Sequence, residues 1–122
     1  MKFNHVEPPQ LNELLTETVD GKRYYVTPTG KKYPSVTTVS GFSTAKQIKQ
    51  WRERVGEEKA NRISTQASVR GTAVHKLCED YLNNVEDYDK GHMPVNLQAF
   101  YPLKELLDTH VNNIVMQEVP LY

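Results

Sequence analysis

Cysteine, long apolar runs and strand-forming stretches are all scarce in this chain of 122 residues. The single cysteine, Cys78, excludes an intramolecular disulfide. The sequence shows neither a signal peptide nor an apolar run of membrane-spanning length. We therefore expect a protein of the reducing cytoplasm that is not secreted and makes no membrane contact. With 38% hydrophobic residues it has material for one domain with a modest core.

The order of local patterns predicts an α+β fold. Residues 1–21 are expected to be an irregular entry segment with at most one short helical turn, followed by one domain over residues 22–122. Aromatic and β-branched residues around a Pro/Gly turn predict a β-hairpin, with strands near 24–27 and 32–39, the second an edge strand because it contains Pro34. Apolar spacing predicts helices near 45–55, 57–65, 70–85 and 96–112, and a terminal strand at 114–121. Ser43 or Thr44 would cap the first helix, and Pro102 would kink the last one or delay its start.

A histidine and a glutamate four residues apart are the main candidates for chemistry. On a helix His75 and Glu79 project from the same side, at the border of an apolar stripe of Val74, Leu77, Cys78, Tyr81, Leu82 and Val85. From that border the pair could reach into a cleft, where an imidazole nitrogen and a carboxylate oxygen suit Mn²⁺ or Mg²⁺. The same spacing also fits an ordinary hydrogen bond on a helix surface.

The residues just before this pair favour contact with a phosphate. Gly71, expected near a helix start, would let a nucleic-acid strand approach closely, and Arg70 could bind a phosphate with its planar guanidinium. A plain turn between two helices explains Gly71 equally well.

These residues form part of an ordered series of motifs. Pro34-Ser35-Val36-Thr37, then Trp51, then Arg70-Gly71-Thr72-x-x-His75-x-x-x-Glu79, and finally Glu118-Val119-Pro120-Leu121 stand in that order. From about Tyr24 onward, the chain resembles the N-terminal half of RecB-like exonucleases of the PD-(D/E)XK superfamily, which includes phage exonucleases and the mitochondrial genome maintenance exonuclease.

The resemblance implies the front part of a restriction-endonuclease-like domain that hydrolyses DNA with one or two Mg²⁺ or Mn²⁺ ions. It assigns His75 to the metal, and Glu79 and Glu118 to the acidic catalytic positions. The family's aspartate and E-x-K motif would follow on strands after Tyr122, so we expect the core strands to be missing from this sequence. If the chain is encoded by a phage, its compartment would be the host cytoplasm.

A literal Glu57-Glu58-Lys59 occurs upstream of His75 and has to be weighed as the missing motif. It follows Val55-Gly56 in a polar stretch of helical composition and is not flanked by apolar strand residues. We interpret it as a solvated helix start, where acidic side chains suit the positive end of the helix dipole.

The net charge of zero hides a division along the chain. Residues 22–70 contain eleven Lys and Arg against three Glu, a net charge of +8, and the remainder carries −8. Such a basic segment favours a polyanion such as DNA, although solubilising charge alone would give the same pattern. Within it, the expected DNA contacts are Arg70, Ser35, Thr37, Lys49 and Arg52. We expect Trp51 to be a core residue, with stacking on a base as the alternative.

Three functions therefore compete at this stage. The first is the N-terminal portion of a metal-dependent DNA exonuclease acting on a free end or a single strand. The second is a DNA-binding or interaction module without catalysis, derived from a truncated nuclease. The third is a small helical interaction protein that does not bind DNA even at low salt.

Overall fold

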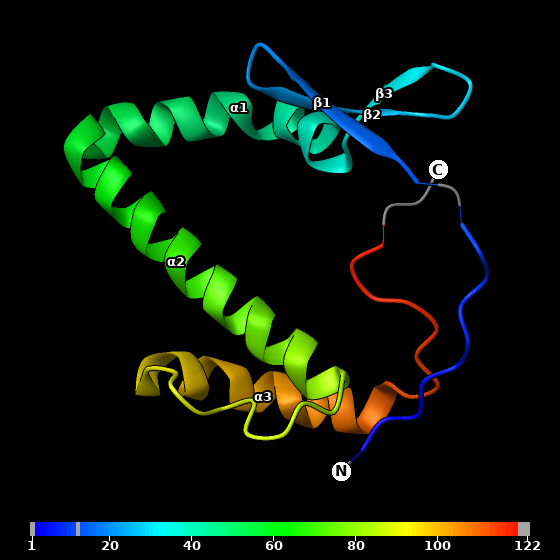
Figure 1. Cartoon of the computed structure of the whole chain (residues 1–122). Coiled ribbons are helices and arrows are strands. Elements are labelled where there is room, and N and C mark those ends of the chain that lie inside the picture. Colours follow the sequence, from blue (N-terminus) through cyan, green and yellow to red (C-terminus); the bar gives the residue numbers. More distant parts are fainter. Residues whose placement is uncertain (1, 12, 120–122) are drawn as a thin grey trace. The chain divides into compact units, whose positions relative to one another are not determined.

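The computed structural model of the chain describes residues 2–11 and 13–119, which contain three strands and three helices (Figure 1). The strands β1 (Leu15–Val19), β2 (Lys22–Val26) and β3 (Lys32–Pro34) form one antiparallel sheet in the order β1-β2-β3. The helices α1 (Val36–Val55), α2 (Glu57–Leu82) and α3 (Pro94–His110) follow. The expected mixture of helices and antiparallel strands is confirmed.

Contacts divide the chain into two units, which we describe separately. The sheet unit consists of residues 9–60 and 118–122, and the helix unit of residues 1–8 and 61–117. None of the helices in the described part of the chain is long and apolar enough to cross a membrane.

The first strand of the sheet unit lies where we expected irregular structure. β1 pairs with β2 from Leu15 opposite Val26 to Val19 opposite Lys22. Asp20 and Gly21 connect the two strands with φ values of 51° and 74°. A two-residue Asp-Gly turn with both φ values positive fits the right-handed twist of a hairpin. The prediction of a loop or a helical turn over this part of residues 1–21 is therefore wrong.

The strand expected over residues 32–39 ends at Pro34, and a helix begins where its second half was placed. Ser35 is the N-cap of α1, and its Oγ accepts a hydrogen bond from the Thr38 N–H at 3.2 Å. A capped helix start outweighs the strand propensity of Val36, Thr37 and Thr38. The expected helix start near residue 45 is wrong for the same reason.

α2 is one helix where we expected two. Gly71 lies inside it and does not have a positive φ, so it neither begins a helix nor forms a turn. The break lies earlier, at Gly56, whose φ of 90° ends α1 and whose N–H donates to the Arg52 carbonyl at 2.9 Å. Glu57 and Glu58 occupy the first turn of α2, as expected of a solvated helix start.

The helix unit holds the main core, where the C-terminal end of α2 meets α3 at an angle (Figure 1). Its buried side chains are Phe3, Leu77, Tyr81, Phe100 and Ile114. The Tyr81 ring meets those of Phe3 and Phe100 edge to face, with centroids 5.2 and 5.7 Å apart. Four residues of the predicted apolar stripe, Leu77, Cys78, Tyr81 and Leu82, belong to this core or pack against it. Val74 is half-buried and not part of it, and Val85 is 45% exposed beyond the helix end.

Residues from both ends of the sequence close this core. The Phe3 N–H donates to Asn84 Oδ1 at 2.7 Å, and Asn84 Nδ2 donates to the Phe3 carbonyl at 2.9 Å. His5 and Ile114 form a single parallel β-bridge. The terminal strand expected at 114–121 is otherwise absent from the described residues, which end at 119; its last two residues lie outside them. Glu118, which we placed on that strand, lies in a bend with a φ of 53°.

Three side chains link α2 to α3 at the edge of the core. The Tyr81 hydroxyl donates to Asp108 Oδ1, and Lys104 Nζ donates to Asp108 Oδ2 at 2.9 Å. The Lys104 ammonium also lies 5.2 Å from the centroid of the Tyr81 ring. These hydrogen bonds, first the one from Tyr81, lower the pKa of Asp108 below its ordinary value.

Removing the Tyr81 hydroxyl should weaken this link without opening a cavity. We expect Tyr81→Phe to lower the free energy of unfolding by about 1–2 kcal/mol, because a hydrogen bond to a charged acceptor is lost. The pKa of Asp108 is lower in the folded than in the unfolded protein, where it is about 4. The Asp108 carboxylate therefore stabilises the folded state fully above the unfolded pKa, and this contribution is lost as the pH falls through the folded pKa. Urea titrations from pH 7 to 2 should therefore show a smaller acid-dependent loss in the variant. An equal loss in both proteins would contradict the role of Asp108.

Truncation of the central aromatic residue should cost much more. Phe100 is fully buried, so Phe100→Ala should lower the free energy of unfolding by about 3–5 kcal/mol. Leu106 on the same helix is 56% exposed, and Leu106→Ala is the matched control, with a change of about 0.5 kcal/mol or less. Thermal unfolding followed by circular dichroism separates the two. Similar losses in both variants would mean that the core is not centred on Phe100.

Candidate functional site

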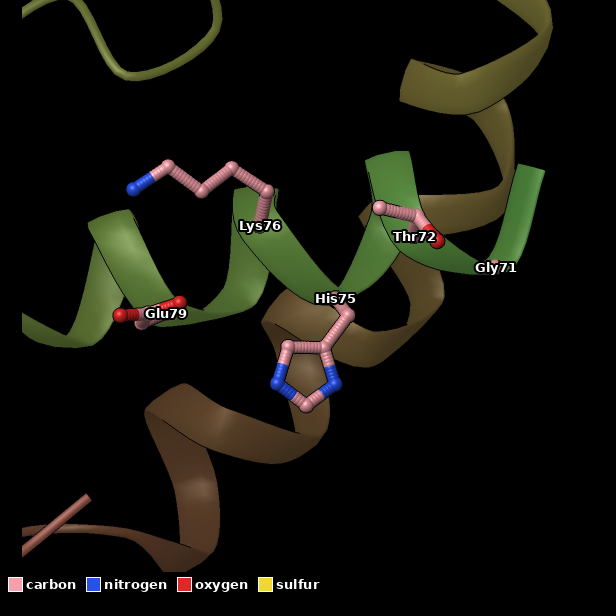
Figure 2. A pocket seen from close by; sticks show the side chains of 5 residues that line it. All are labelled: Gly71, Thr72, His75, Lys76 and Glu79. Atoms are coloured by element: carbon pink, nitrogen blue, oxygen red, sulfur yellow. The ribbon is translucent and has the colours of Figure 1, made fainter. Parts of the chain in front are cut away.

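The C-terminal half of α2 carries the candidate site on its surface. Five residues line an open depression of about 410 Å³: Gly71, Thr72, His75, Lys76 and Glu79. Figure 2 shows the imidazole of His75 and the side chain of Lys76 leaving the helix in different directions, with Glu79 one turn after His75. His75 is exposed and Glu79 half-buried. The structure thus places on one face the two residues that the sequence selected by spacing.

All five lining residues belong to the same helix, so the depression is a helix face and not the cleft we expected. Leu77 and Tyr81 turn to the opposite side and enter the core. A ligand at His75 would therefore contact α2 on one side only, and its other side would remain exposed to solvent. Such a surface suits an extended polymer better than a small molecule, which usually needs an enclosing pocket.

Charge around the depression is mixed. The Lys76 ammonium donates to Asp80 Oδ1 at 2.8 Å, and this hydrogen bond raises the pKa of Lys76. Lys76 is therefore cationic at neutral pH, and its side chain points away from the imidazole of His75 (Figure 2). The face combines a fixed cation with a nitrogen and an oxygen donor.

Arg70 does not share this face. It precedes His75 by five residues, which on an α-helix corresponds to about 140° around the axis. Its side chain is exposed, but it does not line the depression. The expectation that Arg70 opens the helix beside His75 is wrong, because both residues lie within the continuous α2.

The expected DNA contacts at the start of α1 are engaged in capping. Ser35 is only 7% exposed, and its Oγ lies 3.2 Å from Thr37 Oγ1 and 2.8 Å from Thr38 Oγ1. Ser35 is thus a structural residue in this geometry, since its hydroxyl serves the helix end. Thr37 is exposed in the first turn of the helix and not on a strand.

The two basic candidates farther along α1 differ from each other. Arg52 forms a double hydrogen bond with Glu57, from Nε at 3.2 Å and from Nη2 at 2.8 Å, and this pairing raises the pKa of Arg52. Lys49 is exposed on the helix surface. Trp51, expected in the core, is half-buried and is not a member of the core cluster. All three residues belong to the sheet unit, whereas His75 belongs to the helix unit.

A complete metal site is not assembled within residues 2–11 and 13–119, where no three His, Cys, Asp or Glu side chains gather closely enough to hold an ion. His75 and Glu79 supply two donors, and Glu118 belongs to the other unit. Mg²⁺ commonly takes one or two protein carboxylates and completes its shell with water and substrate phosphates. The donor chemistry of the pair therefore fits a Mg²⁺ or Mn²⁺ ion shared with a phosphate.

One contact in the sheet unit had no counterpart in the sequence predictions. Lys22 Nζ lies 4.8 Å from the centroid of the Phe42 ring, which is 66% exposed. We missed it because residues 36–44 were not expected to be helical. Had Ser35 been taken as an N-cap, the four-residue spacing from Thr38 to Phe42 would have placed both on one face of α1.

Comparisons with protein-family models, with curated proteins and with solved structures gave no match to this chain.

The position of Gly71 inside a helix leads to a stability prediction. A Cβ at Gly71 would meet nothing within 4 Å, and its φ is not positive. We expect Gly71→Ala to raise the free energy of unfolding by about 0.5–1 kcal/mol, because alanine loses less backbone entropy in a helix. Gly56→Ala, at a φ of 90°, is the control and should destabilise. Urea unfolding measures both, and a destabilised Gly71→Ala variant would argue for a break in α2 at this point.

Proposed function

We propose that this chain is the N-terminal portion of a metal-dependent DNA exonuclease of the RecB-like PD-(D/E)XK type, and that the exposed face of α2 around His75 binds the DNA phosphate. The observation that carries the proposal is the depression on α2, four of whose five lining residues are Gly71, Thr72, His75 and Glu79. These are the residues of the motif that also carries the sequence resemblance. Their gathering on one accessible face supports a shared role.

Each lining residue has a property that suits a phosphodiester. The open space beside Gly71 lets a sugar–phosphate backbone approach the helix. The Thr72 hydroxyl can donate to a phosphate oxygen, and the Lys76 ammonium attracts the same negative charge. His75 and Glu79 would hold the divalent ion against that phosphate.

A bound Mg²⁺ or Mn²⁺ would supply Lewis-acid stabilisation of the negative charge that develops on the phosphate. The helix contributes orientation, because residues 75 and 79 are one turn apart on a rigid element. Two protein ligands leave room in the coordination shell for phosphate oxygens and water. Arg70 would contact the DNA only where the strand extends beyond this face, and Glu118 remains the second acidic catalytic candidate that the resemblance implies.

A second candidate function follows from the incomplete donor set. Within the described residues no third metal donor gathers with His75 and Glu79, and the literal E-x-K, Glu57-Glu58-Lys59, lies in the first turn of α2. A module of this composition would bind DNA without cutting it. This alternative predicts strongly salt-dependent binding that needs no divalent ion.

Replacement of the histidine tests the proposed metal role. We expect His75→Ala to weaken Mn²⁺ binding in the presence of a 15-nucleotide DNA by at least tenfold, since half of the protein donor pair is removed. Electron paramagnetic resonance of free Mn²⁺ measures the affinity, and His92→Ala, in the loop before α3, is the matched control. Unchanged Mn²⁺ affinity in His75→Ala would falsify the assignment of His75.

The same proteins separate the two candidate functions. Fluorescence anisotropy of an end-labelled DNA measures its affinity for the full chain at low salt, in EDTA and in Mn²⁺. An affinity that Mn²⁺ raises, and that His75→Ala returns to the value in EDTA, would support the nuclease portion. An affinity that is the same in EDTA and in Mn²⁺ and unchanged in His75→Ala would support the module. Absence of DNA binding at low salt would reject both.

A further inference from the structure

Phe42 is a large aromatic side chain left on the surface by the fold. It lies in the second turn of α1 and is 66% exposed, so most of its ring is accessible even with the Lys22 ammonium 4.8 Å from its centroid. All twenty residues of α1 are described, and none of them is buried. The ring therefore does not serve a core in this unit.

The placement of Lys22 beside this ring is fixed by the backbone. The carbonyl of the next residue, Arg23, accepts hydrogen bonds from the Ser35 N–H at 3.1 Å and from Thr38 Oγ1 at 3.4 Å. These contacts join β2 to the first turn of α1. Because Phe42 follows Thr38 by four residues, it lies on the same helix face one turn later. The cation and the ring thus meet through two anchored elements.

Two further cations continue along this face. Lys46 and Lys49 follow Phe42 by four and seven residues, which places them about 6 and 10 Å farther along α1. Both are exposed. The aromatic ring therefore stands at one end of a row of ammonium groups.

The charge of the surrounding chain is of one sign. Residues 21–52 contain seven Lys and Arg and no Asp or Glu. Two of these cations have carboxylate partners, Lys32 with Glu17 at 2.6 Å and Arg52 with Glu57 at 2.8 Å. Neither pair involves Lys22, Lys46 or Lys49. The row along Phe42 thus complements a polyanion.

We propose that Phe42, Lys22, Lys46 and Lys49 form a binding site for single-stranded DNA, in which one base stacks on the Phe42 ring and the lysines contact successive phosphates. An exposed aromatic ring beside a line of cations is how proteins bind single strands without reading their sequence. A duplex keeps its base faces stacked inside and would use only the lysines. The inference deepens the proposed function by naming the form of DNA and a second contact surface, and its geometry does not depend on His75.

Loss of the ring should weaken single-strand binding selectively. We expect Phe42→Ala to weaken the binding of fluorescein-labelled dT15 by about tenfold in EDTA, since stacking on one aromatic side chain is worth about that much. The affinity for a 15-base-pair duplex should change less than twofold. Phe42→Trp should restore dT15 binding, and Tyr101→Ala, which removes a 49% exposed aromatic residue of α3, should leave it unchanged. Fluorescence anisotropy measures these affinities for the wild-type chain and for the three variants.

The lysines have a separate signature in the salt dependence. For single strands each phosphate contact adds roughly 0.7 to the slope of log affinity against log salt concentration. Lys46→Ala and Lys49→Ala should each reduce the slope by about that amount. Lys90→Ala, in the loop before α3, should leave the slope unchanged and is the charge control.

The outcomes distinguish this site from the one at His75. Phe42→Ala with unaltered dT15 affinity would overturn the stacking site while leaving the His75 proposal intact. The expected tenfold loss of dT15 affinity in Phe42→Ala, together with an unchanged Mn²⁺ affinity in His75→Ala, would support the stacking site and reject the metal role of His75. Tighter binding of rU15 than of dT15 would overturn the assignment to DNA and identify the ligand as single-stranded RNA. Self-association that disappears in Phe42→Ala, seen by sedimentation velocity, would assign the face to a second copy.

Discussion

The packing of Tyr81 between α2 and α3 is the contact on which the helix unit depends. Its ring lies against Phe3 and Phe100, and its hydroxyl binds Asp108 beside Lys104. One side chain thereby joins the N-terminal segment, α2 and α3. Because a core of so few buried side chains has little redundancy, the orientation of the opposite face of α2 depends on this contact as well. The position of His75 and Glu79 outside the core is thus a consequence of the burial of Leu77 and Tyr81.

Apolar periodicity in the sequence was sufficient to predict the parts of the fold that bury a face. The stripe containing Leu77 and Tyr81 and the helix around Phe100 both appear as expected, with α3 within two residues of its predicted ends. The wrong predictions concern segments whose secondary structure is determined by helix capping or by turn geometry. Asp20-Gly21 makes a hairpin that we took for irregular chain, and Ser35 begins a helix within a run of β-branched residues. Local hydrogen bonds at such points outweigh average propensity.

The candidate site shows the same division. The spacing of His75 and Glu79 was enough to place them on one face, because helix geometry alone determines that. It was not enough to place Arg70, since its direction depends on whether the helix is continuous through Gly71. Nor could it foresee that the Ser35 hydroxyl is occupied by the helix cap. Polar residues that suit a ligand equally suit the ends of secondary structure, and only the fold decides between the two uses.

The absence of buried side chains along α1 has a consequence for its dynamics. A helix that gains little from burial is held mainly by its cap and its backbone hydrogen bonds, so its free energy of local opening is small. Its amide hydrogens should then exchange with solvent much faster than those of α3. A ligand on this face would meet an ensemble in which part of the population has lost the helix, and its observed affinity would be reduced by that fraction. Changes that only strengthen the helix, far from any contact, would thus tighten binding by enlarging the competent population.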